Sequence, residues 1–147
     1  YISDKYGLKC VITSSKNDYE RDFVKKIINQ MTSSPLNLSG RTNLHELLSV
    51  IKNSEFLISP DSGPIHIATC ANIPVIGLYG VTNTTRAGPY NSIDLCVDKY
   101  NSALKKYTGK KPEEANWRYK NNHKDVMRLI GVDEVREKVD KLFLRGA

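Results

Sequence analysis

Apolar residues recur along the chain with two different spacings, which predict alternating strands and helices. The short apolar run Cys10–Ile12 is followed by the polar Thr13–Ser15, a pattern typical of a buried strand that ends in a loop. Apolar residues then recur at helical spacing from Val24 to Met31, and Asn17 or Asp18 is suited to cap the start of that helix. The first part of the chain therefore predicts a strand, a loop and a helix.

The next segment repeats this order. Leu36–Leu38 is a brief extended piece, and Leu44–Ile51 places apolar residues in helical register. Asn43 and Glu46 have the spacing of a capping box, in which each side chain binds the backbone amide of the other residue. We expect a second strand followed by a second helix.

Strand and helix patterns continue to about residue 97. Proline and glycine residues separate the apolar runs and mark the turns between them. The predicted elements are a strand at Phe56–Ser59, a turn at Pro60–Pro64, a short helix at Ile65–Ala71, a strand at Val75–Tyr79, a loop at Gly80–Asn91 and a strand at Ile93–Val97.

This alternation predicts an α/β fold. Parallel strands need a crossover connection, and the helices that supply it cover the faces of the sheet. We expect a Rossmann-like parallel sheet with helices on both faces, forming a single domain over residues 1–147. Residues 98–122 show no clean period and are expected to be a polar insertion. Val132–Leu142 returns to helical spacing and predicts a closing helix at about 132–144.

The net charge bears on the class of partner, and the cysteines and apolar runs bear on the compartment. The formal net charge of +6 and a pI near 9.2 favour an anionic partner, without choosing among nucleic acid, a phosphorylated small molecule and an acidic membrane surface. Cys10, Cys70 and Cys96 lack metal-site or disulfide spacing, and we interpret them as buried reduced thiols of a cytosolic protein. No apolar run approaches the roughly 20 residues of a membrane span. The chain starts with Tyr1 and soon enters a strand, so we expect a fragment.

The segment Asp61–His66 carries the clearest chemistry. It reads D-S-G-P-I-H and lies between a strand and a helix, where open parallel sheets bind ligands. Gly63 allows close approach of a ligand to the backbone, Pro64 presets the first helical turn, and the free amides of a helix start suit a phosphate. No G-x-G-x-x-G or G-K-[ST] occurs, which argues against a dinucleotide fingerprint and a P-loop.

Three ordered blocks extend this motif and resemble glycosyltransferase family nine, which contains the ADP-heptose lipopolysaccharide heptosyltransferases. They read L-S-G-R-T-N-L-H-E-L-L, then L-I-S-P-D-S-G-P-I-H-I-A, then P-V-I-G-L-Y-G-V-T-N-T-T-R-A-G-P-Y, within residues 38–90. The resemblance implies a GT-B fold of two Rossmann-like domains, of which this chain is similar to the C-terminal, donor-binding one. The N-terminal acceptor domain and the first strand of the C-terminal domain are then expected to precede residue 1.

The resemblance also implies roles for individual residues. Asp61 is expected near the donor sugar, Ser62 and Gly63 at the diphosphate, and His66 as the catalytic group that stabilises the departing nucleotide. Arg41 and Thr42 correspond to the loop near the adenine, and Glu20 or Asp18 to the acidic residue that reaches the ribose. Thr82 is expected to donate to a phosphate and Arg86 to balance its charge. Thr13–Ser15 replaces the family's usual glycine-rich turn.

The implied reaction is inverting transfer of a heptose, or a related sugar, from an ADP-sugar to a lipopolysaccharide core acceptor. No metal or other cofactor is expected, and this chain alone is expected to be inactive without its acceptor domain. The predicted location is the cytoplasm, with the inner face of the inner membrane as an additional contact, and no nucleic acid as partner. The alternatives are another GT-B enzyme that uses a UDP-sugar and a noncatalytic nucleotide-sugar-binding or partner-docking module.

Overall fold

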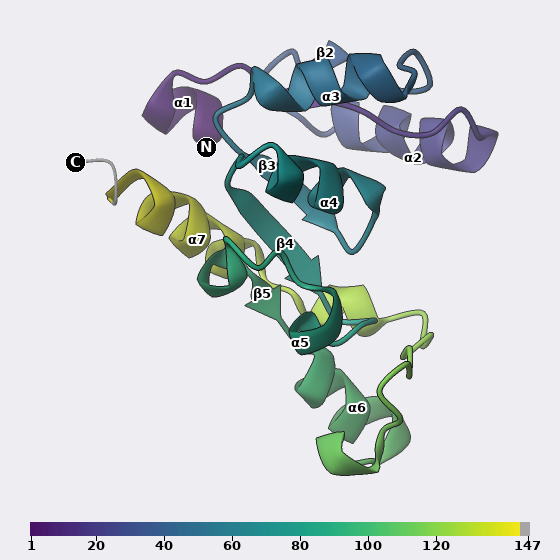
Figure 1. Ribbon diagram of the computed structural model, residues 1–147. Helices are drawn as coiled ribbons and strands as arrows, with labels where there is room; N and C mark the ends of the chain where they lie inside the picture. Colours follow the sequence, from purple (N-terminus) through teal and green to yellow (C-terminus); the bar gives the residue numbers. More distant parts are fainter. Residues whose placement is uncertain (145–147) are drawn as a thin grey trace. The chain divides into compact units, whose positions relative to one another are not determined.

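The computed structural model describes residues 1–144, and the chain divides into two compact units, Tyr1–Ser49 and Val50–Ala147. Figure 1 traces the elements of both. Each unit is described by itself, because the position of one relative to the other is not defined. Both units have parallel strands connected through helices, as the sequence predicts.

The first unit is built around two short parallel strands. Strand β1 (Val11–Ile12) pairs with β2 (Leu36–Asn37), with Val11 opposite Leu36. Helix α2 connects them, and Val24 on this helix is buried. The helices of this part are α1 (Ile2–Tyr6), α2 (Asp18–Ile28) and α3 (Leu44–Lys52), the last of which continues past Ser49.

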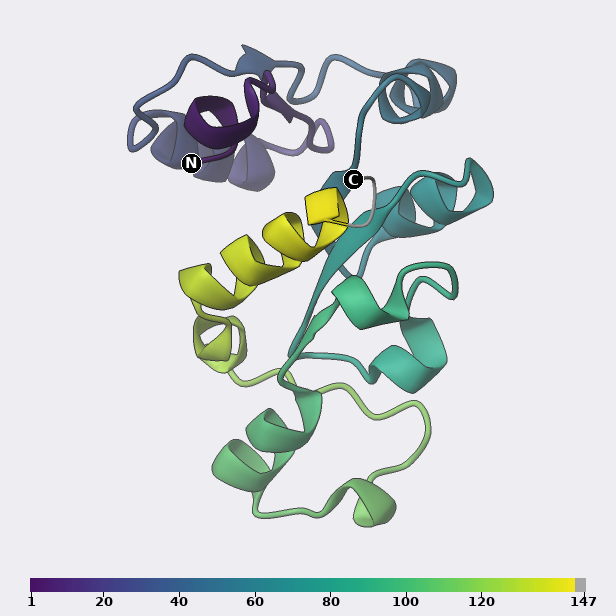
Figure 2. The same ribbon diagram turned by 90° about the vertical axis from the view of Figure 1, so that its left-hand side faces the viewer.

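The second unit contains a parallel three-stranded sheet in the order β3-β4-β5. Helices α4 and α5 lie on one side of this sheet and α7 on the other, which Figure 2 shows most clearly. The strands are β3 (Leu57–Pro60), β4 (Val75–Tyr79) and β5 (Val97–Asp98), and the α-helices are α4 (Gly63–Cys70), α5 (Thr84–Ala87), α6 (Tyr100–Thr108) and α7 (Val132–Leu144). Three 3-10 turns complete it, η1 (Ile93–Leu95), η2 (Pro112–Glu114) and η3 (Val126–Leu129).

The central strand β4 forms the middle of the core. Val75, Ile76 and Tyr79 are fully buried, as expected for a strand with neighbours on both edges and helices on both faces. Gly77 is required by packing, because a Cβ there would lie 2.5 Å from the Tyr79 ring and 3.0 Å from the Cys96 sulfur. The predicted strand Val75–Tyr79 is confirmed residue for residue.

The predicted helix caps are also present. The side-chain oxygen of Asn17 accepts a hydrogen bond from the Glu20 amide at 2.9 Å and caps α2. At the start of α3, the Asn43 amide donates to Glu46 at 2.7 Å and the Glu46 amide donates to Asn43 at 3.0 Å. The capping box inferred from spacing alone is therefore confirmed.

The strand predicted at Ile93–Val97 is wrong over most of its length. The segment forms η1, and only Val97 and Asp98 pair with β4. Ser92 explains the difference, because its buried hydroxyl accepts a hydrogen bond from the Val75 amide at 3.2 Å. The chain therefore passes the start of β4 as a turn and joins the sheet only at Val97.

The segment 98–122, predicted to be an unpatterned polar insertion, begins with a packed helix. Tyr100, Ala103 and Leu104 of α6 are buried, and with Tyr107 they have the spacing i, i+3, i+4 and i+7.

The interpretation of the cysteines needs a smaller correction, because Cys96 is buried but Cys10 is half-buried and Cys70 is exposed. Burial raises the pKa of the Cys96 thiol to about 11. Across residues 1–144, no helix is both long and apolar enough to cross a bilayer.

The contribution of α6 to the core gives a stability prediction. Leu104 is fully buried, so Leu104→Ala should lower the free energy of unfolding by about 2–5 kcal/mol. The exposed neighbour Lys105 is the matched control, and Lys105→Ala should change it by less than about 0.5 kcal/mol. Denaturant unfolding followed by the fluorescence of Trp117, the single tryptophan, measures both in the second unit. Equal, small effects would show that α6 lies outside the core.

Candidate functional site

Strands β3 and β4 end level with each other, which brings two loops to one edge of the sheet. Ser59 lies opposite Gly77 and Pro60 opposite Leu78. The chain leaves β3 directly into Asp61, and leaves β4 into Gly80 and the residues that follow. Two of the three predicted blocks of site residues therefore meet at the carboxyl ends of neighbouring strands.

The start of helix α4 is open to an external ligand. Its N-cap residue Ser62 makes no side-chain cap, since the Ser62 hydroxyl instead contacts the Ser59 hydroxyl at 2.9 Å. Gly63 is exposed, and a Cβ built on it meets nothing within 4 Å. An uncapped, sterically clear helix N-terminus presents partial positive charge from its amides, which suits an anion.

Asp61 and His66 flank this helix start. Asp61 is half-buried, and its negative charge contributes to the raised pKa of Tyr79, after burial and the Cys96 thiol. Asp61 also follows directly after Pro60, which lies opposite Leu78 of β4. His66 is exposed in the fourth position of α4. The structure thus places a carboxylate and an imidazole at one helix end, where the Gly63 amide is sterically accessible, Pro64 has no N–H and the Ile65 amide donates to the Ser62 carbonyl at 3.1 Å.

The loop after β4 adds two polar groups that lack partners among the described residues. The Thr82 hydroxyl and the Nε of Arg86 are buried and make no hydrogen bond there. Thr82 is only 3% exposed. Buried polar groups are nearly always paired, and an unpaired one costs about 1–3 kcal/mol. Both residues were singled out from the sequence, and both have hydrogen-bonding capacity left for a ligand.

Asn121 is a third such residue, which the sequence did not indicate. It is 1% exposed, its Nδ2 has no partner within residues 1–144, and its backbone amide donates to the Val81 carbonyl at 2.9 Å. It therefore packs against the loop that holds Thr82. The polar surroundings of Asn121 in the sequence gave no signal of its burial.

The remaining predicted residues belong to the first unit. The carboxylate of Glu20 accepts hydrogen bonds from the Ser15 amide at 2.8 Å and from Asn17 Nδ2 at 3.4 Å. Gly40, in the left-handed region at φ 68°, lies against this loop, since a Cβ there would be 3.5 Å from the Ser15 carbonyl oxygen. Arg41, which is exposed, and Thr42, which is half-buried, follow directly.

The first unit therefore brings Glu20 and the Arg41–Thr42 segment to one edge, at the carboxyl ends of β1 and β2. Glu20 also has a local role, since it holds the loop between β1 and α2. A ribose contact of Glu20 or Asp18 and an adenine contact of Arg41 and Thr42 stay predictions.

No cluster of three or more His, Cys, Asp or Glu side chains that could hold a metal ion occurs within residues 1–144. Whether the reaction uses a metal stays a prediction from the resemblance. The polar side chains at this edge of the sheet are the Asp61 carboxylate before α4 and the Thr82 hydroxyl and Arg86 guanidinium in the segment after β4. Chemically, this set can bind a phosphate and hydroxyl groups next to it.

The parallel strands with flanking helices define an α/β protein. Residues 2–117 match the family model described as glycosyltransferase family 9 (heptosyltransferase), so the chain belongs to that family. The match reaches into both units of the structure and includes all the predicted site residues. The family resemblance stated from the sequence is confirmed.

Individual relatives agree with this assignment. The chain is 37% identical over 143 residues to the lipopolysaccharide core heptosyltransferase OpsX of Haemophilus influenzae, covering 97% of this chain and 41% of that protein. It is 26% identical over 138 residues to a lipopolysaccharide heptosyltransferase 3 of Escherichia coli, covering 93% and 38%. The chain thus spans about two fifths of the length of these relatives.

A solved structure has the same fold. The crystal structure of a family 9 glycosyl transferase from Veillonella parvula superposes with a TM-score of 0.71 at 24% identity, covering 95% of this chain and 37% of that one. The predicted α/β fold with parallel strands and flanking helices is therefore confirmed.

The unpaired hydroxyl of Thr82 gives a prediction. Thr82→Val removes a buried hydroxyl without a partner and should raise the free energy of unfolding by about 1 kcal/mol. Thr69 is the matched control, because it is also buried but its hydroxyl donates to the Ile65 carbonyl at 2.8 Å. Thr69→Val should give no gain. Denaturant titration of both variants measures the difference, and equal effects would contradict an unpaired Thr82.

Proposed function

We propose that this chain is the donor-binding part of a longer inverting glycosyltransferase, which transfers a heptose or related sugar from an ADP-sugar to a lipopolysaccharide core acceptor. The observation that carries the proposal is the open N-terminus of α4, which follows Asp61 and comes after β3, the neighbour of the strand that leads into the Thr82 loop. Membership of the family and the relatives' names support the choice of heptose and of lipopolysaccharide. The relatives' greater length supports a further, acceptor-binding part.

The diphosphate of the donor is assigned to the helix start. The Gly63 amide and the positive end of the α4 dipole bind phosphate oxygens, and the clear space at Gly63 lets them approach. Thr82 donates its unpaired hydroxyl, and Arg86 neutralises charge that builds up on the diphosphate as it leaves. Binding of the donor thus satisfies polar atoms that the free chain leaves unpaired.

Asp61 and His66 act on either side of the bond that breaks. The Asp61 carboxylate accepts hydrogen bonds from donor sugar hydroxyls, while His66 donates to a phosphate oxygen of the leaving nucleotide. Removing one donor of this kind typically raises the barrier by about 3 kcal/mol. The acceptor hydroxyl is deprotonated by a carboxylate of the acceptor-binding part, and no metal is needed.

The nucleoside is assigned to residues of the first unit. Arg41 and Thr42 contact the adenine, and Glu20 or Asp18 contacts the ribose. Their gathering at the carboxyl ends of β1 and β2 supports this role, since ligands bind at that edge of parallel sheets.

Calorimetric titration with ADP, UDP and their sugar conjugates tests the proposal. The chain should bind ADP in preference to UDP, and Gly63→Ala should weaken ADP binding about tenfold or more, because the added methyl occupies the space used by the diphosphate. Gly63 does not have positive φ and its Cβ meets no atom, so the variant should remain folded. Asp61→Ala should weaken sugar-nucleotide binding more than ADP binding.

Cys70→Ala is the matched control, because it places an alanine at the exposed far end of the same helix. It should bind ADP like the parent chain. A folded chain that binds no nucleotide, or equal loss in Gly63→Ala and Cys70→Ala, would contradict a donor site at the α4 N-terminus.

We further propose that the enzyme works in the cytoplasm at the inner face of the inner membrane, where its acceptor lies. The segment Lys105–Lys124 supports the membrane contact, because all its lysines and Arg118 are exposed. Lys106 and Lys110 lie over the rings of Tyr107 and Tyr119 and extend a mixed basic and aromatic surface. Such surfaces bind anionic lipid headgroups.

Vesicle cosedimentation tests this contact. Replacing Lys105 and Lys106 by glutamate should weaken binding to anionic vesicles by about 1 kcal/mol or more for each residue. The matched control replaces the exposed Lys26 and Lys52 by glutamate and should have a smaller effect. Binding that is independent of vesicle charge and salt would contradict the proposal.

A further inference from the structure

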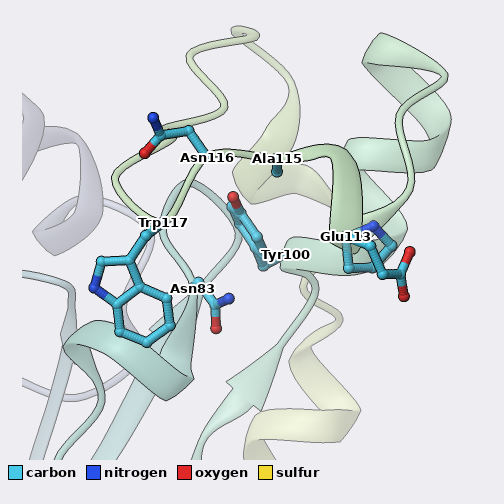
Figure 3. Close-up of a pocket in the computed structure, with 7 residues that line it drawn as sticks. Asn83, Tyr100, Glu113, Ala115, Asn116 and Trp117 are labelled. Atoms are coloured by element: carbon cyan, nitrogen blue, oxygen red, sulfur yellow. The ribbon is translucent and has the colours of Figure 1, made fainter.

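A second pocket opens beside the proposed donor site, within the second unit. It has a volume of about 470 Å³, and Asn83, Tyr100, Glu113, Ala115, Asn116 and Trp117 line it (Figure 3). Asn83 follows β4, and Tyr100 starts α6 directly after β5. The pocket therefore lies at the same edge of the sheet as the donor site, but beside β4 and β5 rather than β3 and β4.

The two sites are joined through Arg86. Asn83 of the pocket caps α5, the short helix that carries Arg86. Arg86 is the residue proposed to balance the diphosphate charge. The pocket and the proposed leaving-group contact therefore share the segment Asn83–Arg86.

One wall of the pocket is rigid. Tyr100 is 3% exposed, its hydroxyl donates to the Tyr119 carbonyl at 3.2 Å, and its amide donates to Asp98 at 2.8 Å. Asn83 is fixed because its side-chain oxygen caps α5, accepting from the Thr85 amide at 2.9 Å. These contacts hold the wall in place before any ligand binds.

The opposite wall carries an exposed tryptophan. Trp117 is 59% exposed, which is unusual for the largest apolar side chain, and in Figure 3 the Tyr100 ring lies between it and Glu113. An indole face is electron-rich and packs well against C–H groups that carry partial positive charge. The C–H face of a pyranose ring provides such a surface.

The polar groups of the pocket suit hydroxyls. Asn83 and Asn116 use their side-chain oxygens for backbone amides at 2.9 Å each, which leaves both NH2 groups as donors. The Glu113 carboxylate is an acceptor and the Trp117 indole N–H a further donor. A mixture of donors and acceptors around an aromatic face matches the alternating hydroxyls of a sugar, whereas a phosphate would need more positive charge.

We infer that this pocket is a saccharide subsite, in which Trp117 stacks on a pyranose ring of the acceptor and Asn83, Asn116 and Glu113 bind its hydroxyls. The inference rests on the proposed function for the identity of the saccharide, a lipopolysaccharide core unit. The volume of the pocket falls in the range of roughly 300–1,000 Å³ typical of small-ligand sites. A saccharide subsite here would give this part of the enzyme a direct role in holding the acceptor.

The single tryptophan of the chain makes the test direct, because its fluorescence and its one indole N–H resonance both report on this pocket. The probes are deacylated lipopolysaccharide core oligosaccharide, the neutral maltotriose, and ADP. We expect the core oligosaccharide to shift both signals saturably, with a Kd in the millimolar range or tighter. Maltotriose and ADP should leave them nearly unchanged.

Two variants separate the pocket from the donor site. Trp117→Ala should weaken binding of the core oligosaccharide about tenfold, measured by calorimetry, while ADP binding stays at the parent level. Tyr19→Ala is the matched control, because it removes a highly exposed aromatic ring that lies in the first unit, away from this pocket in the sequence. It should change neither the binding of the core oligosaccharide nor that of ADP. Asp61→Ala should weaken sugar-nucleotide binding more than ADP binding and leave binding of the core oligosaccharide unchanged.

Three results would overturn the inference. ADP alone shifting the Trp117 signals would make the pocket a nucleobase site, and equal shifts with maltotriose and core oligosaccharide would remove its specificity for the acceptor. No response to any saccharide would remove the subsite. If the unmutated chain did not bind ADP, the donor-site proposal would be contradicted instead. Failure of the saccharide subsite and failure of the donor site are therefore distinguishable.

Discussion

The parallel pairing of β3 with β4, which continues to the last residue of β3, is the constraint on which the rest of the site depends. Because Pro60 lies opposite Leu78, the segments that follow β3 and β4 leave the sheet at nearly the same level. The first exit supplies Asp61 and the start of α4, and the second supplies the Thr82 loop. Residues twenty positions apart are thereby placed at one edge without any direct bond between them.

In the second unit, some buried polar side chains are hydrogen-bonded and others are not, and each unpaired one lowers the stability of the fold. Among its buried polar side chains, Ser59, Thr69 and Ser92 all make hydrogen bonds within the chain. Among residues 50–144, the buried side-chain atoms without a hydrogen-bond partner belong to Thr82, Arg86 and Asn121, which lie in or adjoin the segment after β4. Unpaired buried groups confined to one place are expected at a binding site, where a ligand supplies the missing partners.

Much of the fold could be predicted from the sequence, because local patterns determined it. Strand Val75–Tyr79 is a continuous apolar run between turn residues, and the caps at Asn17 and Asn43 follow from spacing alone. The strand expected at Ile93–Val97 failed because a long-range contact, Ser92 to the Val75 amide, decides the path of the chain there. No local pattern contains that information.

The site was predictable to the extent that a contiguous motif carried it. Asp61–His66 reads as a strand-to-helix turn, and the structure places it at the carboxyl end of β3. Thr82 and Arg86 followed from the family resemblance, but their unpaired atoms could be seen only in three dimensions. Asn121 and the Trp117 pocket were missed because lysines and asparagines obscure the helical period of α6 and the turns after it.

The most direct test of the central claim is to map ADP onto the chain by amide NMR. If the diphosphate binds at the edge formed by β3 and β4, the largest shifts at low ADP concentration should occur at Ser62, Gly63, Ile65 and Thr82. Smaller shifts should follow near Arg41. Shifts confined to other surfaces, with the amides at the start of α4 unmoved at saturating ADP, would contradict the account.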